Sequence, residues 1–159
     1  MPPARAGASG SSMIDFVGRE DSTLDRKGRC IVPATYRRQI IGQSLYIRPS
    51  IRGAFLEAWP SANFEADAAP RLGPLDIPAD EEDRRLYALI ADVVPVTPDA
   101  DGRVVLPPHL VEEAQLGTEI VFVGRRSFLE IWSRPAFAEF MRGVRASLAR
   151  RAAPAGGVA

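Results

Sequence analysis

The sequence predicts an α+β fold in which one folding unit occurs twice. A motif of the form Asp-x-x-Gly-Arg, three apolar residues and Pro occupies residues 25–33 and returns 74 positions later at residues 99–107. A second motif, Phe-Leu-Glu-x-Trp, follows each copy, at residues 55–59 and then 73 positions later at residues 128–132. Short apolar segments surround these motifs, and sequence with helical spacing follows each half. Similarity at a fixed period indicates one structural unit used twice, with a pseudo-two-fold repeat.

The first half is expected to hold short strands around a tight turn. Residues 25–28 fit the turn, because Asp is favoured at its first position and Gly at its fourth. Pro33 suits the first turn of a helix, and Gly42 would end that helix in the left-handed conformation. The expected elements in chain order are a strand within residues 16–24, a strand at 30–32, a helix over 33–42, and a hairpin of 45–47 with 54–59.

The second half is expected to repeat this order, and helices are expected to flank both halves. Apolar side chains at helical spacing predict the flanking helices. The repeated elements are a strand at 93–97, a turn at 99–102, a strand at 104–106, a helix over 107–115, and a hairpin of 119–124 with 127–132. The flanking helices are expected at 61–69, 78–91 and 135–150.

These elements divide the chain into six segments. The segments are a disordered leader (1–12), a first half (13–60), a helical connector (61–92), a second half (93–133), a C-terminal helix (134–151) and a disordered tail (152–159). Each half is too short to bury a large core alone, so we expect the halves to share a core or to pair with other copies of the chain. Either Met1 or Met13 could be the natural start.

Composition argues against a membrane protein and against an enzyme. No stretch approaches the ~20 apolar residues of a membrane span, and the leader lacks the apolar region of a signal peptide, so a cytoplasmic protein is expected. Cys30 is the only cysteine and His109 the only histidine, which excludes an intrachain disulfide and a zinc site of His and Cys ligands. Phosphate-binding and dinucleotide-binding motifs are absent from the sequence. We therefore expect no catalytic residues, no cofactor and no metal; Cys30 should be buried, His109 should lie on a helix surface, and the acidic run 76–83 should be a solvated helix start.

Local charge distinguishes the first copy of the turn. The chain has no net charge, yet residues 24–38 carry five cations and one acid, whereas residues 97–113 carry four acids and one cation. Arg26, Lys27 and Arg29 crowd one exposed turn, and their mutual repulsion favours a bound anion. A basic loop of this kind can contact phosphates, and Arg can bind guanine in the major groove. The candidate DNA-binding residues are Asp25, Arg26, Lys27, Gly28, Arg29, Arg37 and Arg38.

A purely structural interpretation of the turn is favoured for the second copy. Gly would allow the left-handed conformation, Asp would accept backbone N–H bonds, and Arg would pair with the Asp four residues before it. Asp99, Gly102 and Arg103 lie in acidic sequence. We expect them to form a rigid turn, with at most a weak contact to DNA.

The two Asp-x-x-Gly-Arg turns, the Phe-Leu-Glu-x-Trp motif after each, and their tandem order resemble the MraZ family over residues 16–140. That family consists of bacterial transcriptional regulators. The resemblance implies two tandem AbrB-like swapped-hairpin β-barrel halves in one chain. It also implies DNA contact through the first-half loop, with Asp25 orienting the loop and Arg29 as the main contact. The second loop departs from the first, because Ala100 and Asp101 replace its two basic residues.

The same resemblance implies two partners. They are double-stranded promoter DNA with short direct repeats, and further copies of the chain in a ring-shaped homo-oligomer. The promoter would be that of the division and cell-wall gene cluster, which implies a cytoplasmic, nucleoid-associated protein and favours a repressor, with activation left open. Direct repeats suit a ring, because successive subunits present the same loop in the same sense.

Two other functions stay open at this point. The first is an antitoxin-like or other swapped-hairpin interaction module without specific DNA readout, in which the Arg-rich C-terminal segment binds a partner. The second is an enzyme. Salt separates the DNA binder from the interaction module, because neutralising phosphates makes affinity fall steeply as salt rises.

Overall fold

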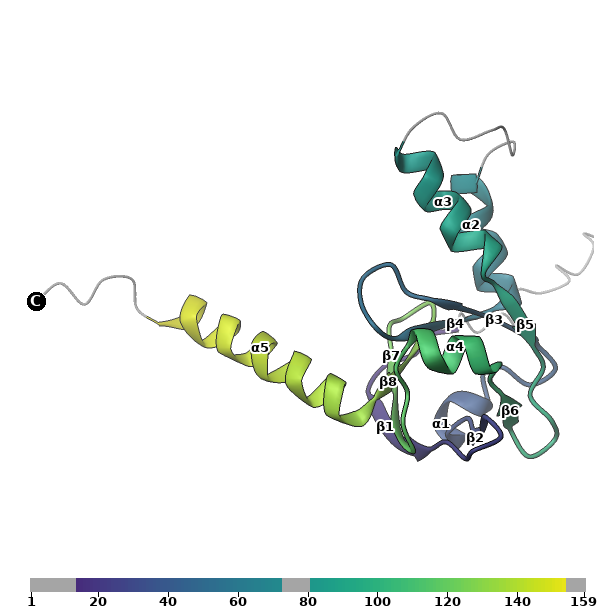
Figure 1. The fold of residues 1–159 in the computed structure, drawn as a ribbon, viewed down its shortest axis with the longest axis horizontal. Coiled ribbons are helices and arrows are strands. Elements are labelled where there is room, and N and C mark those ends of the chain that lie inside the picture. Colours follow the sequence, from purple (N-terminus) through teal and green to yellow (C-terminus); the bar gives the residue numbers. More distant parts are fainter. Residues whose placement is uncertain (1–13, 73–80, 154–159) are drawn as a thin grey trace, which may run out of the picture.

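The computed structural model describes residues 14–72 and 81–153 of the 159-residue chain. It is an α+β fold with antiparallel strands, so the class expected from the sequence is confirmed (Figure 1). The strands are β1 (Arg19–Thr23), β2 (Arg29–Ile31), β3 (Leu45–Pro49), β4 (Leu56–Pro60), β5 (Val94–Val96), β6 (Arg103–Val105), β7 (Glu119–Gly124) and β8 (Leu129–Ser133). The helices are α1 (Ala34–Arg37), α2 (Ser61–Leu72), α3 (Glu81–Ala91), α4 (Pro108–Glu113) and α5 (Arg134–Ala152).

Strands from the two halves alternate in one antiparallel sheet of order β1-β7-β8-β4-β3-β5. β1, from the first half, forms one edge beside β7, with Arg19 opposite Val123. β5, from the second half, forms the other edge beside β3, with Ile47 opposite Val94. Each half therefore contributes a hairpin to the centre of the sheet and an edge strand to the hairpin of the other half.

A separate two-stranded ribbon joins the halves a second time. In it β2 pairs antiparallel with β6, with Arg29 opposite Val105 and Ile31 opposite Arg103. The ribbon lies at the end of the molecule away from α2 and α3 (Figure 1). The turns that precede β2 and β6 are therefore brought to one end of the fold, although they lie in different halves of the sequence.

One face of the sheet packs on a core that both halves share. Successive side chains of a strand point to opposite faces, and Leu56 and Ala58 of β4 point to the same face as Leu129 and Ile131 of β8. All four are buried. Side chains from β2, β6, α1 and α4 complete the cluster. The halves thus share a core, as one of the two expectations from their size required.

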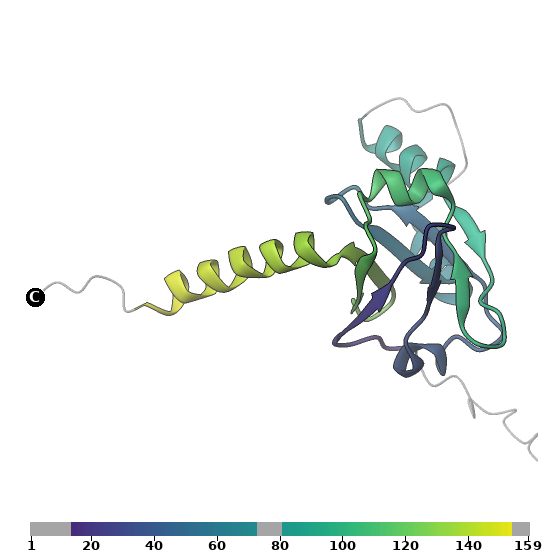
Figure 2. The same ribbon diagram turned by 60° about the horizontal axis from the view of Figure 1, so that its bottom comes forward.

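The opposite face of β4 and β8 carries the repeated aromatic motif. Phe55 stacks on Trp132 with ring centroids 4.1 Å apart, and Phe128 stacks on Trp59 at 4.3 Å. The Phe of each copy therefore covers the Trp of the other copy. The start of α5 closes over this layer through Phe137, and the rest of α5 leaves the body of the protein (Figure 2).

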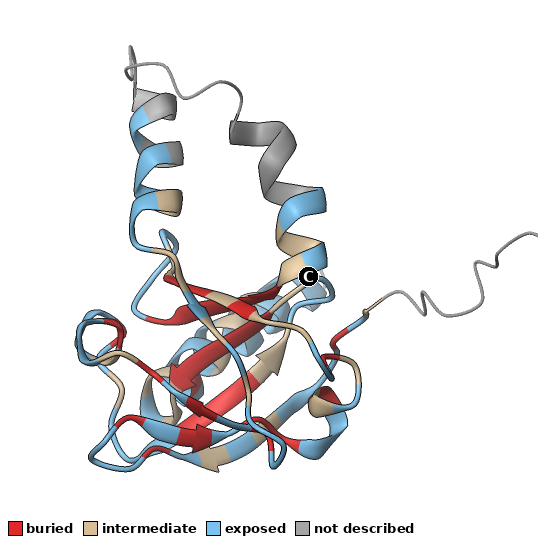
Figure 3. Cartoon of the chain, turned by 90° about the vertical axis from the view of Figure 1, so that its right-hand side faces the viewer, coloured by how far each residue is buried: buried red, intermediate tan, exposed pale blue. Residues whose placement is uncertain are grey.

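The helices α2 and α3 extend from the part of the sheet that contains β3 and β4 (Figure 3). The Arg48 guanidinium of β3 donates to the carbonyl of Leu89 in α3 at 3.4 Å, which ties this extension to the sheet. None of the helices formed by residues 14–72 and 81–153 combines the length and apolar character of a membrane span.

α1 is shorter than the sequence predicts. The sequence favours a helix that continues to Gly42, whereas α1 ends at Arg37. Beyond that point the N–H groups of Gln39 and Ile40 donate to carbonyls three residues back, so tight turns replace the α-helix. Gly42 does have the expected left-handed conformation, with φ of +75°.

Several expectations fall wholly or partly outside the described residues. They are the leader and the choice of start residue, the beginning of the helix predicted at 78, the acids at 76–80, and the tail from 154 onward. Ala152, placed in the tail by the sequence, is the last residue of α5. The division into six segments stays a prediction.

Candidate nucleic-acid interface

The first Asp-x-x-Gly-Arg motif folds into a turn that its own aspartate and glycine hold. The Asp25 carboxylate accepts hydrogen bonds from the backbone N–H groups of Lys27 and Arg29, both at 2.9 Å. Gly28 has a φ of +79°, and a Cβ placed on it would collide with the backbone oxygen of Leu106. Both conformation and space therefore require glycine at this position.

The second motif builds the same turn with a different neighbour. The Asp99 carboxylate accepts from the N–H groups of Asp101 and Arg103, both at 2.9 Å. Gly102 has a φ of +80°, and a Cβ on it would meet the side chain of Arg37. The glycine of the first turn therefore faces backbone, whereas the glycine of the second faces a flexible side chain.

Hydrogen bonding keeps both aspartates ionised. The backbone N–H of Arg29 is the largest cause that lowers the pKa of Asp25, and the side chain of Arg29 adds to it. The backbone N–H of Arg103 likewise lowers the pKa of Asp99. Each turn is thus ordered by a carboxylate that carries its negative charge at neutral pH.

The turns lead into strands whose outward faces form one surface. In β2 and β6 the middle residues, Cys30 and Val104, point into the core. The outer residues of both strands are exposed; they are Arg29, Ile31, Arg103 and Val105. We call these four side chains the ribbon face. Because Arg29 lies opposite Val105 and Ile31 opposite Arg103, cations and apolar side chains alternate on the ribbon face in both directions.

The two arginines of the ribbon face are held differently. Arg29 Nε lies 2.7 Å from Asp25 Oδ2, and 54% of its side chain stays exposed. Arg103 lies 3.5 Å from Asp101, with 58% of its side chain exposed. The expected pairing with the Asp four residues earlier is therefore confirmed for Arg29, whereas the ion pair of Arg103 is with Asp101. Both guanidinium groups border the same hollow of about 370 Å³.

The other candidate cations fall into two groups. Arg26 and Lys27 are exposed in the first turn, and Arg38 is exposed at the end of α1. Arg37 is half-buried: its guanidinium donates to the carbonyl of Asp101 at 2.9 Å and to that of Val32 at 3.2 Å. The described geometry therefore gives Arg37 a part in positioning the second turn.

Sequence reasoning did not single out Ile31 and Val105. The signal was present in the alternation of Arg-Cys-Ile and Arg-Val-Val, because the residues at either end of such a tripeptide share one face of a strand. Cys30 is buried as expected, and burial raises the pKa of its thiol to about 12, which makes it a poor nucleophile. His109 is exposed on α4, also as expected.

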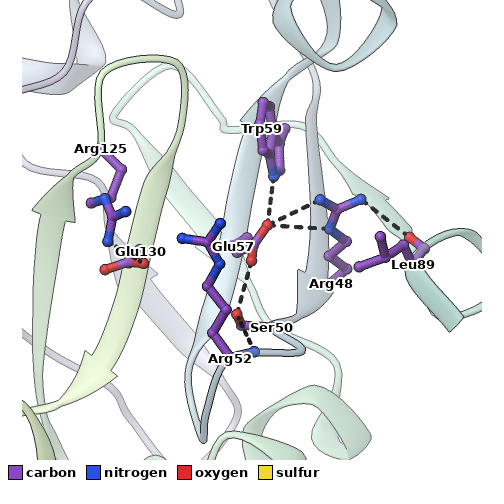
Figure 4. A network of polar contacts seen from close by, with 8 residues as sticks. All are labelled: Arg48, Ser50, Arg52, Glu57, Trp59, Leu89, Arg125 and Glu130. Atoms are coloured by element: carbon purple, nitrogen blue, oxygen red, sulfur yellow. Dashed lines mark hydrogen bonds and ion pairs between the residues drawn. The ribbon is translucent and has the colours of Figure 1, made fainter. Parts of the chain in front are cut away.

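The Phe-Leu-Glu-x-Trp motifs build a buried polar pair on the outer face of the sheet (Figure 4). Glu57 of β4 lies opposite Glu130 of β8, and both are buried. Each carboxylate accepts a hydrogen bond from the indole of its own motif, Trp59 at 3.0 Å and Trp132 at 3.1 Å. The motif therefore serves to place an acid between strands rather than at an open site.

The two buried glutamates have unequal partners. Glu57 accepts from the buried Arg48 at 3.0 Å and from the Ser50 hydroxyl at 2.8 Å. Glu130 pairs with Arg125 at 3.3 Å, and 42% of that arginine side chain is exposed. Burial raises the pKa of Glu130, and the neighbouring charge of Glu57 acts in the same direction.

Comparisons with known proteins agree on one family. The family model described as "MraZ protein, putative antitoxin-like" matches residues 89–156. A protein of Gluconacetobacter diazotrophicus named "Transcriptional regulator MraZ" is 39% identical over 136 residues, which cover 82% of this chain and 85% of that protein. Proteins of the same name from Parvibaculum lavamentivorans and Gluconobacter oxydans are 37% and 30% identical, covering 80% and 84% of this chain and 81% and 84% of their own length.

Proposed function

The chain belongs to the MraZ family, and from that premise we propose that it is a DNA-binding transcriptional regulator without enzymatic activity. We propose that it reads duplex DNA with the ribbon face and the turn before β2. The observation that carries the proposal is the position of Arg29 and Arg103. They stand on one exposed face of a two-stranded ribbon, which is an element that fits the major groove.

The residues of the first turn have separate roles in this proposal. Asp25 orients the turn through its three bonds to Lys27 and Arg29, and Gly28 lets the turn approach β6. Arg29 donates to guanine O6 and N7, as a bidentate guanidinium can. The exposed cations Arg26 and Lys27 contact phosphates and set register without reading sequence.

The second turn contributes less in this proposal. Asp99 and Gly102 shape it, and Arg37 positions it through the bond to the Asp101 carbonyl. Arg103 faces the same groove as Arg29, but with Asp101 at 3.5 Å it competes for the same DNA phosphates less well. Arg38, exposed at the end of α1, adds a phosphate contact.

We further propose that the protein acts as a ring-shaped homo-oligomer on direct repeats. The part of α5 that leaves the body supports self-association, because Phe140 and Leu148 are 47% and 59% exposed and border a hollow with Val144. A rotationally ordered ring presents equal ribbon faces in one sense, which matches direct repeats. Several weakly bound faces on one duplex gain affinity from their effective concentration.

The proposed target is the promoter of the division and cell-wall gene cluster, which includes the gene for this protein. Occupation of a promoter by a ring would exclude other proteins from it, so we propose repression. The protein would act in the cytoplasm, associated with the nucleoid.

The test is the affinity of Arg29→Ala for the upstream region of the gene and for a scrambled duplex. One bidentate contact contributes about 1–3 kcal/mol of discrimination. With two ribbon faces engaged, the loss would be roughly 2–6 kcal/mol, or at least about 30-fold. Arg84→Ala removes an equal charge from an exposed position on α3, at the other end of the molecule, and serves as the matched control. Circular dichroism and mass should be unchanged in both variants.

A second candidate is an interaction module of the antitoxin-like kind. The printed description of the matching family and the exposed apolar stripe of α5 favour it. It would replace the DNA proposal if promoter and scrambled duplexes bound equally and if affinity did not fall with salt.

A further inference from the structure

We propose that Ile31 and Val105 determine sequence specificity by contacting the C5 methyl group of thymine in the major groove. The inference rests on the proposed function, because it takes duplex DNA as the molecule that covers the ribbon face. It adds a second kind of readout to the arginine contacts: two apolar contacts that only one of the four bases can satisfy from the major groove.

The first step is the exposure of the two side chains. Ile31 is 47% exposed and Val105 is 55% exposed, although both are large apolar residues. β-branched residues favour strands wherever a strand lies, so exposure alone does not distinguish a binding role from strand propensity. The neighbours of these residues make the distinction.

The second step is what stands across the ribbon from each arginine. Arg29 has Val105 opposite it, and Arg103 has Ile31 opposite it. A carboxylate at either position would pair with the arginine and neutralise it. Apolar side chains instead leave each guanidinium free of a partner on the neighbouring strand, which suits a face that has to bind anions and base edges.

The third step is spacing. Residues two apart on one strand, such as Arg29 and Ile31, are about 6.6–6.8 Å apart along the strand. Stacked bases on one DNA strand are about 3.4 Å apart. An arginine and an apolar side chain of the same strand therefore span about two base steps, so a guanine contact and a thymine contact can be made together.

The fourth step is the choice of occupant. The two apolar side chains are separated by cations in both directions, so they form no continuous apolar patch of the size that protein partners bind. Arg26 and Lys27 add exposed positive charge next to Arg29. Alternating cations and methyl groups complement the edge of DNA, where phosphates and guanine acceptors flank thymine methyls.

The experiment changes the DNA before it changes the protein. The wild-type protein is titrated with the upstream duplex containing thymine and with the same duplex containing deoxyuracil, which lacks only the C5 methyl group. Loss of one methyl contact should weaken binding roughly threefold to fivefold, the scale set by burial of a single carbon group. A scrambled duplex measures non-specific affinity in parallel.

Variants then assign the effect to the two side chains. Ile31→Ala and Val105→Ala should bind the thymine duplex more weakly than wild type and should lose part or all of the difference between thymine and deoxyuracil. Val17→Ala is the matched control, because Val17 is 58% exposed but lies outside the ribbon; it should keep the full difference.

The outcomes separate this inference from the proposed function. Specific binding by wild type that is equal for thymine and deoxyuracil would overturn the thymine contact and leave the regulator intact. Equal weakening of both duplexes by Ile31→Ala and Val105→Ala would show that the side chains act only on the ribbon's structure, and would also overturn it. Absence of any preference for the upstream duplex would overturn the proposed function itself.

Discussion

The two copies of the repeated unit use the same backbone and surround it with different charges. In both turns an aspartate accepts two backbone bonds of 2.9 Å. In the first, Arg29 then pairs with that aspartate at 2.7 Å; in the second, Arg103 lies near Asp101 instead. The aspartate and glycine thus preserve the shape of the turn, while the remaining positions are free to set its charge.

The buried glutamates show the same division. Both accept an indole bond from their own motif, but Glu57 has a buried arginine and a hydroxyl, whereas Glu130 has one partly exposed arginine. Equal backbone geometry therefore does not imply equal energetic roles. The following predictions test how far the two copies differ.

The largest difference is expected between the buried glutamates. Glu57→Gln leaves the charge of Arg48 buried without a carboxylate, and loss of one member of a buried pair costs about 3–5 kcal/mol. Glu130→Gln leaves only the partly exposed Arg125 and should change the free energy of unfolding by less than about 1 kcal/mol. Urea unfolding at one fixed protein concentration measures both. Equal destabilisation would mean that the two motifs are energetically equivalent.

The turn glycines should differ next. An alanine with positive φ costs about 1–2 kcal/mol, and at Gly28 it would also collide with the backbone of Leu106. We expect Gly28→Ala to destabilise by about 2–4 kcal/mol and Gly102→Ala by about 1–2 kcal/mol, because the Arg37 side chain can move. Gly42→Ala, with positive φ and open space, controls for conformation alone. Thermal unfolding checks the order, and a larger effect at Gly102 would contradict it.

A smaller difference is expected between the two arginines in DNA binding. Arg29→Glu should weaken affinity about tenfold more than Arg103→Glu, a free-energy difference of about 1.4 kcal/mol. The reason is that Arg103 already stands in a negative field from Asp99 and Asp101, whereas Arg29 belongs to a basic turn. Titration of both variants against the upstream duplex measures the ratio. Equal weakening would make the two turns equal partners on DNA.

The smallest effect concerns pH. The pKa of Glu130 is raised by burial, so the folded protein binds this proton more readily than the unfolded chain. The resulting cost is complete above the raised pKa and disappears as pH falls toward the ordinary value of a glutamate. Stability curves of wild type and Glu130→Gln should therefore converge as pH falls from neutral. Parallel curves over that window would assign no role to this carboxyl.

Much of the fold could be predicted because its signals are local. Apolar segments between turn residues located most strands, and the repeat showed that they come in two sets. The partner of each strand could not be predicted, because pairing depends on which surfaces bury each other. Nothing in residues 19–23 indicates that they lie beside residues 119–123. The helix after Pro33 was predicted too long for a similar reason, since hydrogen bonding beyond Arg37 is decided by tertiary context.

The candidate site divides in the same manner. Asp25, Gly28 and Arg29 could be singled out from the turn chemistry and the local charge, and the structure places them as that chemistry requires. Their contact with DNA stays a proposal. The ribbon face could not be predicted, because it exists only where β2 meets β6 from the other half. Glu57 and Glu130 belong to a motif visible in the sequence, yet their opposition across two strands appears only in the fold.

The exchange of edge strands has a consequence for synthesis. Arg19 pairs with Val123, so β1 leaves the ribosome long before its partner β7 exists. Such non-local pairing slows folding and leaves strand edges open meanwhile. A chain that stops before β7 lacks not only its second half but also the neighbour that secures β1 in the first. Incomplete products of translation would then be unable to fold around either turn, and the cell would hold only whole copies able to compete for the promoter.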